Sequence, residues 1–159
     1  MPKPKDEAWA WTYLERLVAI RPRTESELRR RLAAKGCVPE IVEKVLAKAR
    51  EAGLVDDEKF ARLYAEDRLL SRPRSRKLLA RELRARGIDP HLAEEASRAA
   101  LPERSERALA CQALERRLPL LRRLPKETAK RRAYSFLLRR GFPGELAREV
   151  VEKLVMGDE

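Results

Sequence analysis

Hydrophobic residues recur along the chain at the spacing of amphipathic helices. Near the start, Ala10, Leu14 and Leu17 stand three or four positions apart, and Leu79 and Leu83 repeat this spacing in the middle. Such spacing places apolar side chains on one face of a helix, where they pack against a core. Alanine, leucine, arginine and glutamate, all strong helix formers, dominate the sequence. The sequence therefore predicts an all-α protein.

One segment occurs three times: a basic helix, a glycine, an apolar residue and a proline that opens a second helix. The glycines are Gly36, Gly87 and Gly141, spaced about fifty residues apart. Each follows Lys or Arg, and a leucine stands four positions before it. Glycine enters the left-handed conformation that ends a helix without steric cost. We expect all three glycines to be helix caps.

A third amphipathic helix precedes each basic helix, so the sequence predicts three tandem three-helix-bundle repeats. Their boundaries are predicted at 1–53, 54–101 and 102–159. In the first repeat, Thr24 and Glu27 have the spacing of a capping box. Because a bundle of about 50 residues has a marginal core, neighbouring repeats should share apolar contacts, with Leu54-Val55 and Leu101 as candidates. Joined end to end, the repeats are expected to form an elongated, curved body.

The positive charge is concentrated in the three basic helices and the joins before them. The chain has 37 Lys and Arg against 26 Asp and Glu, a net charge of +11. Segments 21–35, 72–86 and 122–140 carry +4, +6 and +7, in total +17, so the rest carries −6. Arginine outnumbers lysine in them, and its planar fork binds phosphate or carboxylate oxygens in pairs. The charge pattern predicts a basic track for nucleic-acid phosphates.

The same arginines also fit a plainer interpretation, in which they solvate helix faces and pair with nearby glutamates. Segregation of the charge into one helix type favours the nucleic-acid interpretation. Asparagine and glutamine, which read base edges, are scarce, with Gln112 the only glutamine. We therefore expect binding without sequence preference.

Several classes of protein are excluded. No apolar run reaches the ~18 residues of a membrane-spanning helix, and residues 1–7 lead into no apolar signal core. Two distant cysteines, Cys37 and Cys111, fit a reducing cytosol as small buried hydrophobes. His91 is the only histidine, Cys-x-x-Cys is absent, and the glycines form no phosphate loop. We expect a cytoplasmic protein with no enzymatic activity, cofactor or metal.

A few residues allow two interpretations. Asp56-Asp57-Glu58 stands at a predicted helix start, which favours capping over metal binding. The aromatic cluster at residues 9–13 is expected to fix the first helix to its bundle rather than stack bases. Phe136 is predicted to be a core residue, whereas Tyr134 fits either the core or base stacking.

The motifs resemble those of the RecX family, bacterial regulators of RecA. Gly53-Leu54-Val55-Asp56-Asp57-Glu58-Lys59-Phe60-Ala61 is similar to the family signature Gly-Leu-(Leu/Ile/Val)-(Asp/Asn)-Asp-x-x-(Phe/Tyr)-Ala. Ser26-Glu27-Leu28, Glu82-Leu83 with Gly87-Ile88, and Phe136–Phe142 match its repeat motifs in order and spacing. The resemblance extends from about Ala8 to Leu154. One departure is Ser71-Arg72-Pro73-Arg74-Ser75, where the family has a Gly-containing join.

The resemblance implies a non-enzymatic negative regulator in DNA recombination, repair and the SOS response. Family members occupy the groove of the RecA–single-stranded DNA filament, bind single- and double-stranded DNA, and inhibit ATPase, strand exchange and coprotease activities. We expect a monomer that does the same. The family's basic surface corresponds here to Arg29, Arg30, Arg72, Arg74, Arg76, Lys77, Arg81, Arg84, Lys130, Arg131 and Arg132.

Two other functions fit the pattern of charge. Helix–glycine–helix segments are also typical of helix-turn-helix DNA-binding regulators, which act without RecA and normally as dimers. A scaffold for acidic proteins would show no DNA binding even at low salt.

Overall fold

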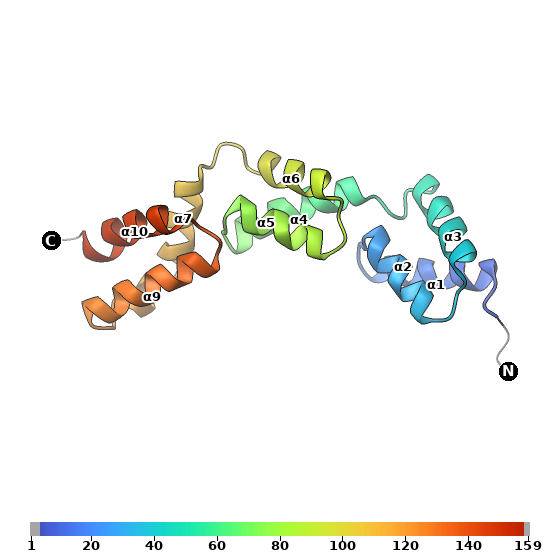
Figure 1. The fold of residues 1–159 in the computed structure, drawn as a ribbon, viewed down its shortest axis with the longest axis horizontal. Coiled ribbons are helices and arrows are strands. Elements are labelled where there is room, and N and C mark those ends of the chain that lie inside the picture. Colours follow the sequence, from blue (N-terminus) through green and yellow to red (C-terminus); the bar gives the residue numbers. More distant parts are fainter. Residues whose placement is uncertain (1–3, 158–159) are drawn as a thin grey trace. The chain divides into compact units, whose positions relative to one another are not determined.

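The described part of the protein is entirely helical. The computed structural model describes residues 4–157, and within that range it has ten α-helices, one π-helix and no strand (Figure 1). The elements are α1 (Glu7–Ile20), α2 (Glu25–Ala34), α3 (Pro39–Glu51), α4 (Asp57–Ser71), α5 (Arg76–Ala85), α6 (Pro90–Ala99), α7 (Glu106–Glu115), α8 (Leu118–Leu121), α9 (Lys126–Arg139), α10 (Gly144–Val151) and the π-helix η1 (Glu152–Met156). The all-α prediction is confirmed.

Helices α2, α5 and α9 end in the same way. Gly36, Gly87 and Gly141 have φ angles of +93°, +87° and +87°. The N–H of the residue after each glycine donates to the carbonyl of the leucine that stands four positions before the glycine. The distance is 3.1 Å in all three cases: Cys37 to Leu32, Ile88 to Leu83 and Phe142 to Leu137. These bonds satisfy carbonyls that the helix end would leave free. The predicted glycine caps are confirmed.

Side-chain oxygens cap the N-terminal ends of several helices by accepting hydrogen bonds from backbone N–H groups. Thr24 accepts from the Glu27 N–H at 3.1 Å at the start of α2, and Ser75 accepts from the Leu78 N–H at 3.0 Å at the start of α5. Asp56 does the same for the Lys59 N–H at 3.1 Å, which confirms its predicted capping role. Only half of the predicted capping box forms, because the Glu27 carboxylate binds Arg21 and Arg23.

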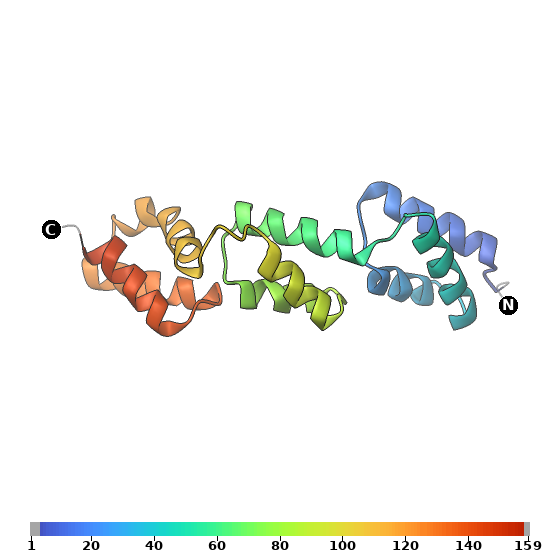
Figure 2. The same ribbon diagram turned by 90° about the horizontal axis from the view of Figure 1, so that it is seen from above.

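The first compact unit contains the chain up to Ala61 and the segment Leu83–Ala93. Its core is an apolar cluster between α1, α2 and α3, the three helices coloured blue to teal in Figure 2. The fully buried side chains there include Leu14, Leu28, Leu32, Val45 and Leu46. Val55 closes this core from beyond α3, as predicted for a residue between repeats, whereas Leu54, predicted with it, is exposed.

The second compact unit contains Arg62–Glu82 and the chain from Glu94 onward. One apolar cluster joins Leu69 of α4 and Leu79 of α5 to buried residues of α7, α9 and α10. Leu101 packs against this cluster, in agreement with its predicted place between repeats. The predicted sharing of apolar contacts between neighbouring repeats is therefore confirmed in this unit, while the boundaries at 53/54 and 101/102 stay a prediction.

The third repeat differs from the predicted three helices. A single helix was predicted before the basic helix of this repeat, but α7 ends at Glu115 and the chain restarts as the short helix α8. Pro119 explains the break, because its ring would collide with the Glu115 carbonyl in a continuous helix and it has no N–H to donate. Leu118 and Leu121 are nevertheless buried in the second core.

Candidate nucleic-acid interface

At two junctions, a hydrogen bond joins the end of one basic helix to the start of another. In the first compact unit, the Thr24 hydroxyl at the start of α2 donates to the Arg86 carbonyl just after α5, at 3.0 Å. In the second, the Ser75 N–H before α5 donates to the Arg140 carbonyl just after α9, at 2.9 Å. In both, the carbonyl end of one basic helix meets the N-terminal end of the basic helix of the preceding repeat. The negative end of one helix dipole thus lies beside the positive end of another.

The junctions also explain why glycine is needed beyond its φ angle. A Cβ on Gly87 would lie 2.2 Å from the Ser26 Cβ, and one on Gly141 would lie 2.4 Å from the Ser75 Oγ and 2.6 Å from the Leu78 Cβ. A Cβ on Gly36, whose repeat is the first, would meet nothing within 4 Å. The sequence predicts the caps but not these close approaches.

The exposed face of α5 carries three basic residues. Lys77, Arg81 and Arg84 follow the i, i+4, i+7 spacing of one helix face, and all three are exposed. They have no ion-pair partner among residues 4–157. Leu79 and Leu83, on the other side of the helix, are fully buried. The α5 face therefore offers three charges to an anionic ligand.

Two further predicted site residues in the middle of the chain have structural partners. Arg74 is only 9 % exposed, and its guanidinium donates to the Glu82 carboxylate at 2.6 Å and to the Arg72 carbonyl at 2.9 Å. The half-buried Arg76 donates to the carbonyls of Ala100 and Leu101 at 2.9 and 2.8 Å. Both arginines differ from the exposed side chains that a phosphate track requires, because they hold chain segments together. Arg72, in the same join, is exposed and has no ion pair within the described range.

The α2 part of the predicted track is divided. Arg30 is exposed and without an ion-pair partner in the part of the chain described. Arg29 binds Glu43 at 2.7 Å, and this bond raises the pKa of its guanidinium. In the first turn of α2, burial alone would raise the pKa of the Glu27 carboxyl, but hydrogen bonds from Arg21 and Arg23 outweigh it and lower the pKa. These ion pairs agree with the plainer interpretation, in which arginines pair with nearby glutamates.

The α9 part contains the exposed pair Arg131 and Arg132, which have no ion-pair partner in residues 4–157. Lys130 binds Glu152 at 2.9 Å, and this bond raises the pKa of its ammonium group. Seven predicted site residues are thus exposed and unpaired: Arg30, Arg72, Lys77, Arg81, Arg84, Arg131 and Arg132. That they form one continuous track stays a prediction.

Sequence analysis missed a cluster of arginines around Phe136. The guanidinium carbons of Arg117 and Arg140 lie 4.7 and 5.0 Å from the centre of its ring. Burial, followed by the charges of Arg74, Arg117 and Arg72, lowers the pKa of Arg140. The signal was present in Arg139-Arg140, the last residues before Gly141. The cluster makes this part of the second unit strongly electropositive.

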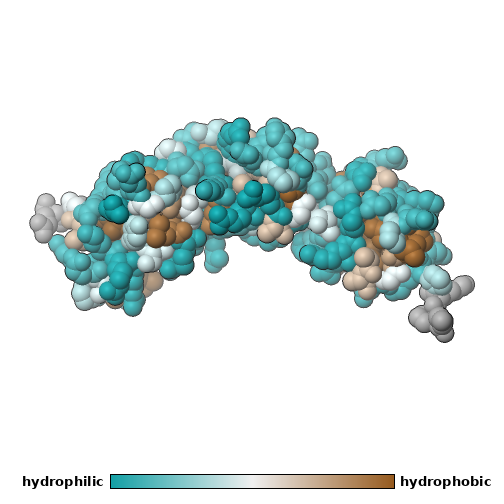
Figure 3. Space-filling view, viewed as in Figure 1, coloured by the Kyte–Doolittle hydropathy of each residue, from teal (hydrophilic) through white to brown (hydrophobic). Residues whose placement is uncertain are grey.

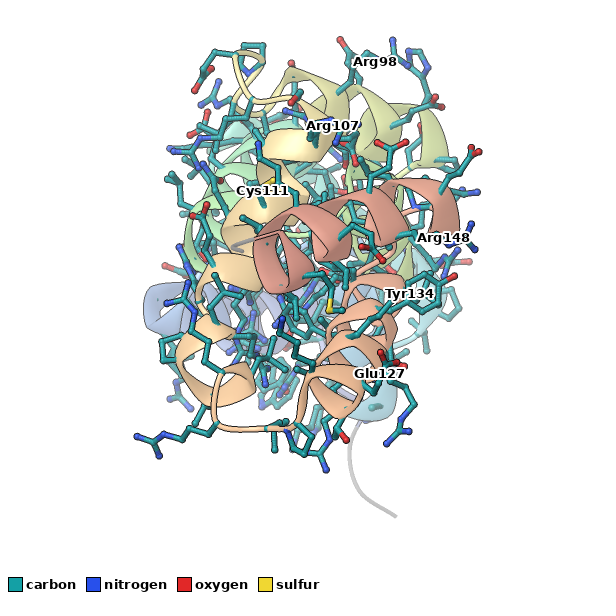
Figure 4. The ribbon with its side chains drawn as sticks, turned by 90° about the vertical axis from the view of Figure 1, so that its left-hand side faces the viewer. Arg98, Arg107, Cys111, Glu127, Tyr134 and Arg148 are labelled. Carbon is teal, nitrogen blue, oxygen red and sulfur yellow. The ribbon has the colours of Figure 1, made fainter. Side chains whose placement is uncertain are left out.

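Burial resolves one of the two aromatic predictions. Phe136 is 8 % exposed, so its predicted place in the core is confirmed. Tyr134 is half-buried against the second core and lines a concavity of about 370 Å³ with Arg131 and Arg148, which keeps both of its interpretations open. Figure 4 shows Glu127, Tyr134 and Arg148 along one side of α9 and α10.

Near the N-terminus, the rings of Trp9 and Tyr13 stack with centroids 5.2 Å apart. The Lys5 ammonium lies 3.9 Å from the centre of the Trp9 ring. Tyr13 and Trp11 pack against the first core, in agreement with their predicted role of fixing α1, while Trp9 is 36 % exposed.

Two classes of site find no support within the described range. No three His, Cys, Asp or Glu side chains of residues 4–157 gather as metal ligands would. Over the same residues, no helix has the length and apolarity to cross a membrane. Hydrophilic side chains cover most of the face in Figure 3.

Tandem helical repeats with a basic helix in each define an all-α repeat protein whose surface is rich in exposed arginines. The sequence matches family models for the first, second and third three-helix domains of RecX at residues 10–48, 56–96 and 105–151. The chain therefore belongs to the RecX family.

Curated relatives and solved structures agree. The regulatory protein RecX of Amycolatopsis mediterranei is 38% identical over 137 residues, 86% of this chain and 78% of the relative. That of Chromohalobacter salexigens is 36% identical over 148 residues, 93% and 90% of the two chains. The crystal structure of RecX from Lactobacillus salivarius shares the fold, with a TM-score of 0.75 at 16% identity over 95% of this chain and 97% of that one.

Proposed function

We propose that this protein is a negative regulator of the RecA recombinase that acts in the cytoplasm as a monomer. It binds DNA without sequence preference and occupies the groove of the RecA–DNA filament, where it inhibits ATPase, strand exchange and coprotease activity. Membership of a family of regulatory proteins supports the regulatory role. The observation that carries the DNA contact is the unpaired basic face of α5, formed by Lys77, Arg81 and Arg84.

The structure narrows the residues proposed to contact DNA or RecA. The seven exposed and unpaired side chains defined above are the main contacts, because their charges are available to phosphates. Arg29 and Lys130 can contact a phosphate only if they give up their ion pairs with Glu43 and Glu152. Arg74 and Arg76 support the site by fixing the join before α5 and the link before α7.

Replacing Lys77, Arg81 and Arg84 together by glutamine is expected to weaken DNA binding and its dependence on salt. Each lost phosphate contact lowers the slope of log affinity against log salt by about 0.7 on single strands, so the slope should fall by about 2. The measurement is a titration of fluorescent oligo-dT at several salt concentrations.

The matched control is Lys44→Gln, Lys59→Gln and Arg62→Gln, which removes the same charge from exposed positions outside the basic helices. This variant should bind with nearly the wild-type slope. Equal losses in the two variants would mean that net charge alone drives binding, and the α5 face would not be the site.

Addition of the protein to RecA filaments already assembled on single-stranded DNA is expected to slow ATP hydrolysis and strand exchange. A protein that contacts several protomers hinders the changes coupled to ATP turnover, so repression should appear well below one molecule per RecA protomer. A protein that competes only for free DNA would need to coat the lattice and would lose its effect on preformed filaments. Full rates at saturating protein would contradict the proposal and favour the helix-turn-helix alternative.

A further inference from the structure

A groove outside the α5 face lies between the α8 region and α9. It has a volume of about 690 Å³, within the range of ligand sites. Five arginines line it and no acidic residue does: Arg117, Arg123, Arg131, Arg132 and Arg139. The remaining lining is mostly apolar, with Leu120, Leu121, Leu124 and Phe136. All of these residues belong to the second compact unit.

The groove keeps apolar surface in contact with water. Leu120 is 61 % exposed, although the neighbouring Leu121 and Leu118 of the same short helix are buried in the core. Apolar side chains that line a concave surface beside a few polar groups are typical of a binding site. Because Leu120 is largely exposed, a partner that binds here would cover it best with an apolar side chain.

The aromatic lining of the groove is poorly suited to stacking bases. Phe136 is its only aromatic residue, it is 8 % exposed, and the guanidinium groups of Arg117 and Arg140 lie over its ring. Single-stranded nucleic acids stack their bases on accessible aromatic faces. Leucine side chains instead match the aliphatic side chains of a protein segment.

The charges specify the rest of the partner. Arg123, Arg131, Arg132 and Arg139 are exposed and have no ion pair among the described residues, so their forks are free. Arginine binds carboxylates in paired hydrogen bonds. We propose that this groove docks an acidic protein segment, in which carboxylates flank one or more aliphatic side chains. The proposal deepens the proposed function, since it gives a protein partner a surface other than the α5 face.

The test uses a fluorescein-labelled synthetic peptide in which glutamates flank leucines at helical spacing. Leu120→Ser is the decisive variant, because it removes apolar surface without changing charge and Leu120 is not part of the core. We expect it to weaken peptide binding roughly tenfold, the effect of leaving one large aliphatic contact unmade. Its affinity for oligo-dT should be unchanged. Arg123→Gln should also weaken peptide binding.

Two controls make the result specific. The variant Lys77→Gln, Arg81→Gln and Arg84→Gln should bind the peptide within about twofold of wild type, since small charge effects away from a site are weak. A peptide with serines in place of leucines should bind wild type more weakly and be insensitive to Leu120→Ser. Thermal unfolding followed by circular dichroism checks that each variant is folded.

Each outcome decides the proposal. Unchanged peptide binding by Leu120→Ser, or an equal loss of peptide and oligo-dT binding, would overturn it, the second result indicating a nucleic-acid groove. If the peptide does not bind wild type while RecA filaments are still repressed, the groove proposal fails and the proposed function stands. If the peptide binds through Leu120 but RecA is unaffected, the groove is a docking site and the proposed function is wrong.

Discussion

Replacing Gly141 by alanine is expected to lower the free energy of unfolding by about 2–4 kcal/mol, because two costs add. At φ +87° the backbone is in the left-handed region, where alanine is strained and glycine is not. Its Cβ would also lie 2.4 Å from the Ser75 Oγ and 2.6 Å from the Leu78 Cβ, so the junction between α9 and α5 must open. The measurement is chemical denaturation followed by circular dichroism.

Gly36→Ala provides the matched control. Gly36 has nearly the same φ, +93°, yet a Cβ there would meet nothing within 4 Å. Only the conformational cost remains, about 1 kcal/mol. If both variants lose the same stability, the close approach at the junction contributes nothing and the glycine serves its helix cap alone.

Replacing Arg74 by alanine is expected to destabilise the protein by about 2 kcal/mol, because it leaves the half-buried Glu82 carboxylate without its cation. The cost is below that of a fully buried pair, since the Glu82 side chain is 24% exposed. The Arg72 carbonyl would lose its side-chain donor as well. Thermal and denaturant unfolding measure the effect.

Arg72→Ala is the control in the same join, and an exposed side chain without an ion pair should change stability by no more than about 0.5 kcal/mol. Adding Glu82→Gln to Arg74→Ala should recover about 1 kcal/mol, since the unpaired charge is removed. Equal effects of Arg74→Ala and Arg72→Ala would contradict a structural role for Arg74. A triple replacement of Arg72, Arg74 and Arg76 would be a poor test of DNA binding, because the loss of Arg74 and Arg76 also disturbs the fold.

The helices, their caps and much of the core could be predicted because they depend on local sequence. A glycine after a basic helix, with leucine four positions before it, specifies one chain geometry wherever it occurs, and Gly36, Gly87 and Gly141 all adopt it. Apolar residues at helical spacing likewise identify the buried face of each helix. Pro119 is also present in the sequence, but Leu114 and Leu118 continue the helical spacing across the break between α7 and α8. The spacing alone therefore predicts one helix there.

The roles of individual arginines could not be predicted, because they depend on partners distant in the sequence. Arg72 and Arg74 have the same local context, yet only Arg74 meets Glu82, eight residues away on α5. Arg76 binds carbonyls 24 and 25 residues away. A charge count treats all three alike. It identifies a basic region, whereas the three-dimensional contacts identify which charges are free.

The two helix junctions mean that the boundaries of the sequence repeats and those of the compact units do not coincide. The first compact unit includes Leu83–Ala93 of the middle repeat, and Thr24 in the first repeat bonds to Arg86 within that unit. Asp57 likewise accepts from the Glu25 N–H at 2.9 Å across the 53/54 boundary. A chimera joined at 53/54 would take Thr24 and Arg86 from different parents, and one joined at 101/102 would do the same to Ser75 and Arg140. An exchange point inside α5, between Glu82 and Leu83, would divide both pairs. Recombination among relatives should therefore be tolerated best before Thr24 or after Arg140, where both partners of each junction come from one parent.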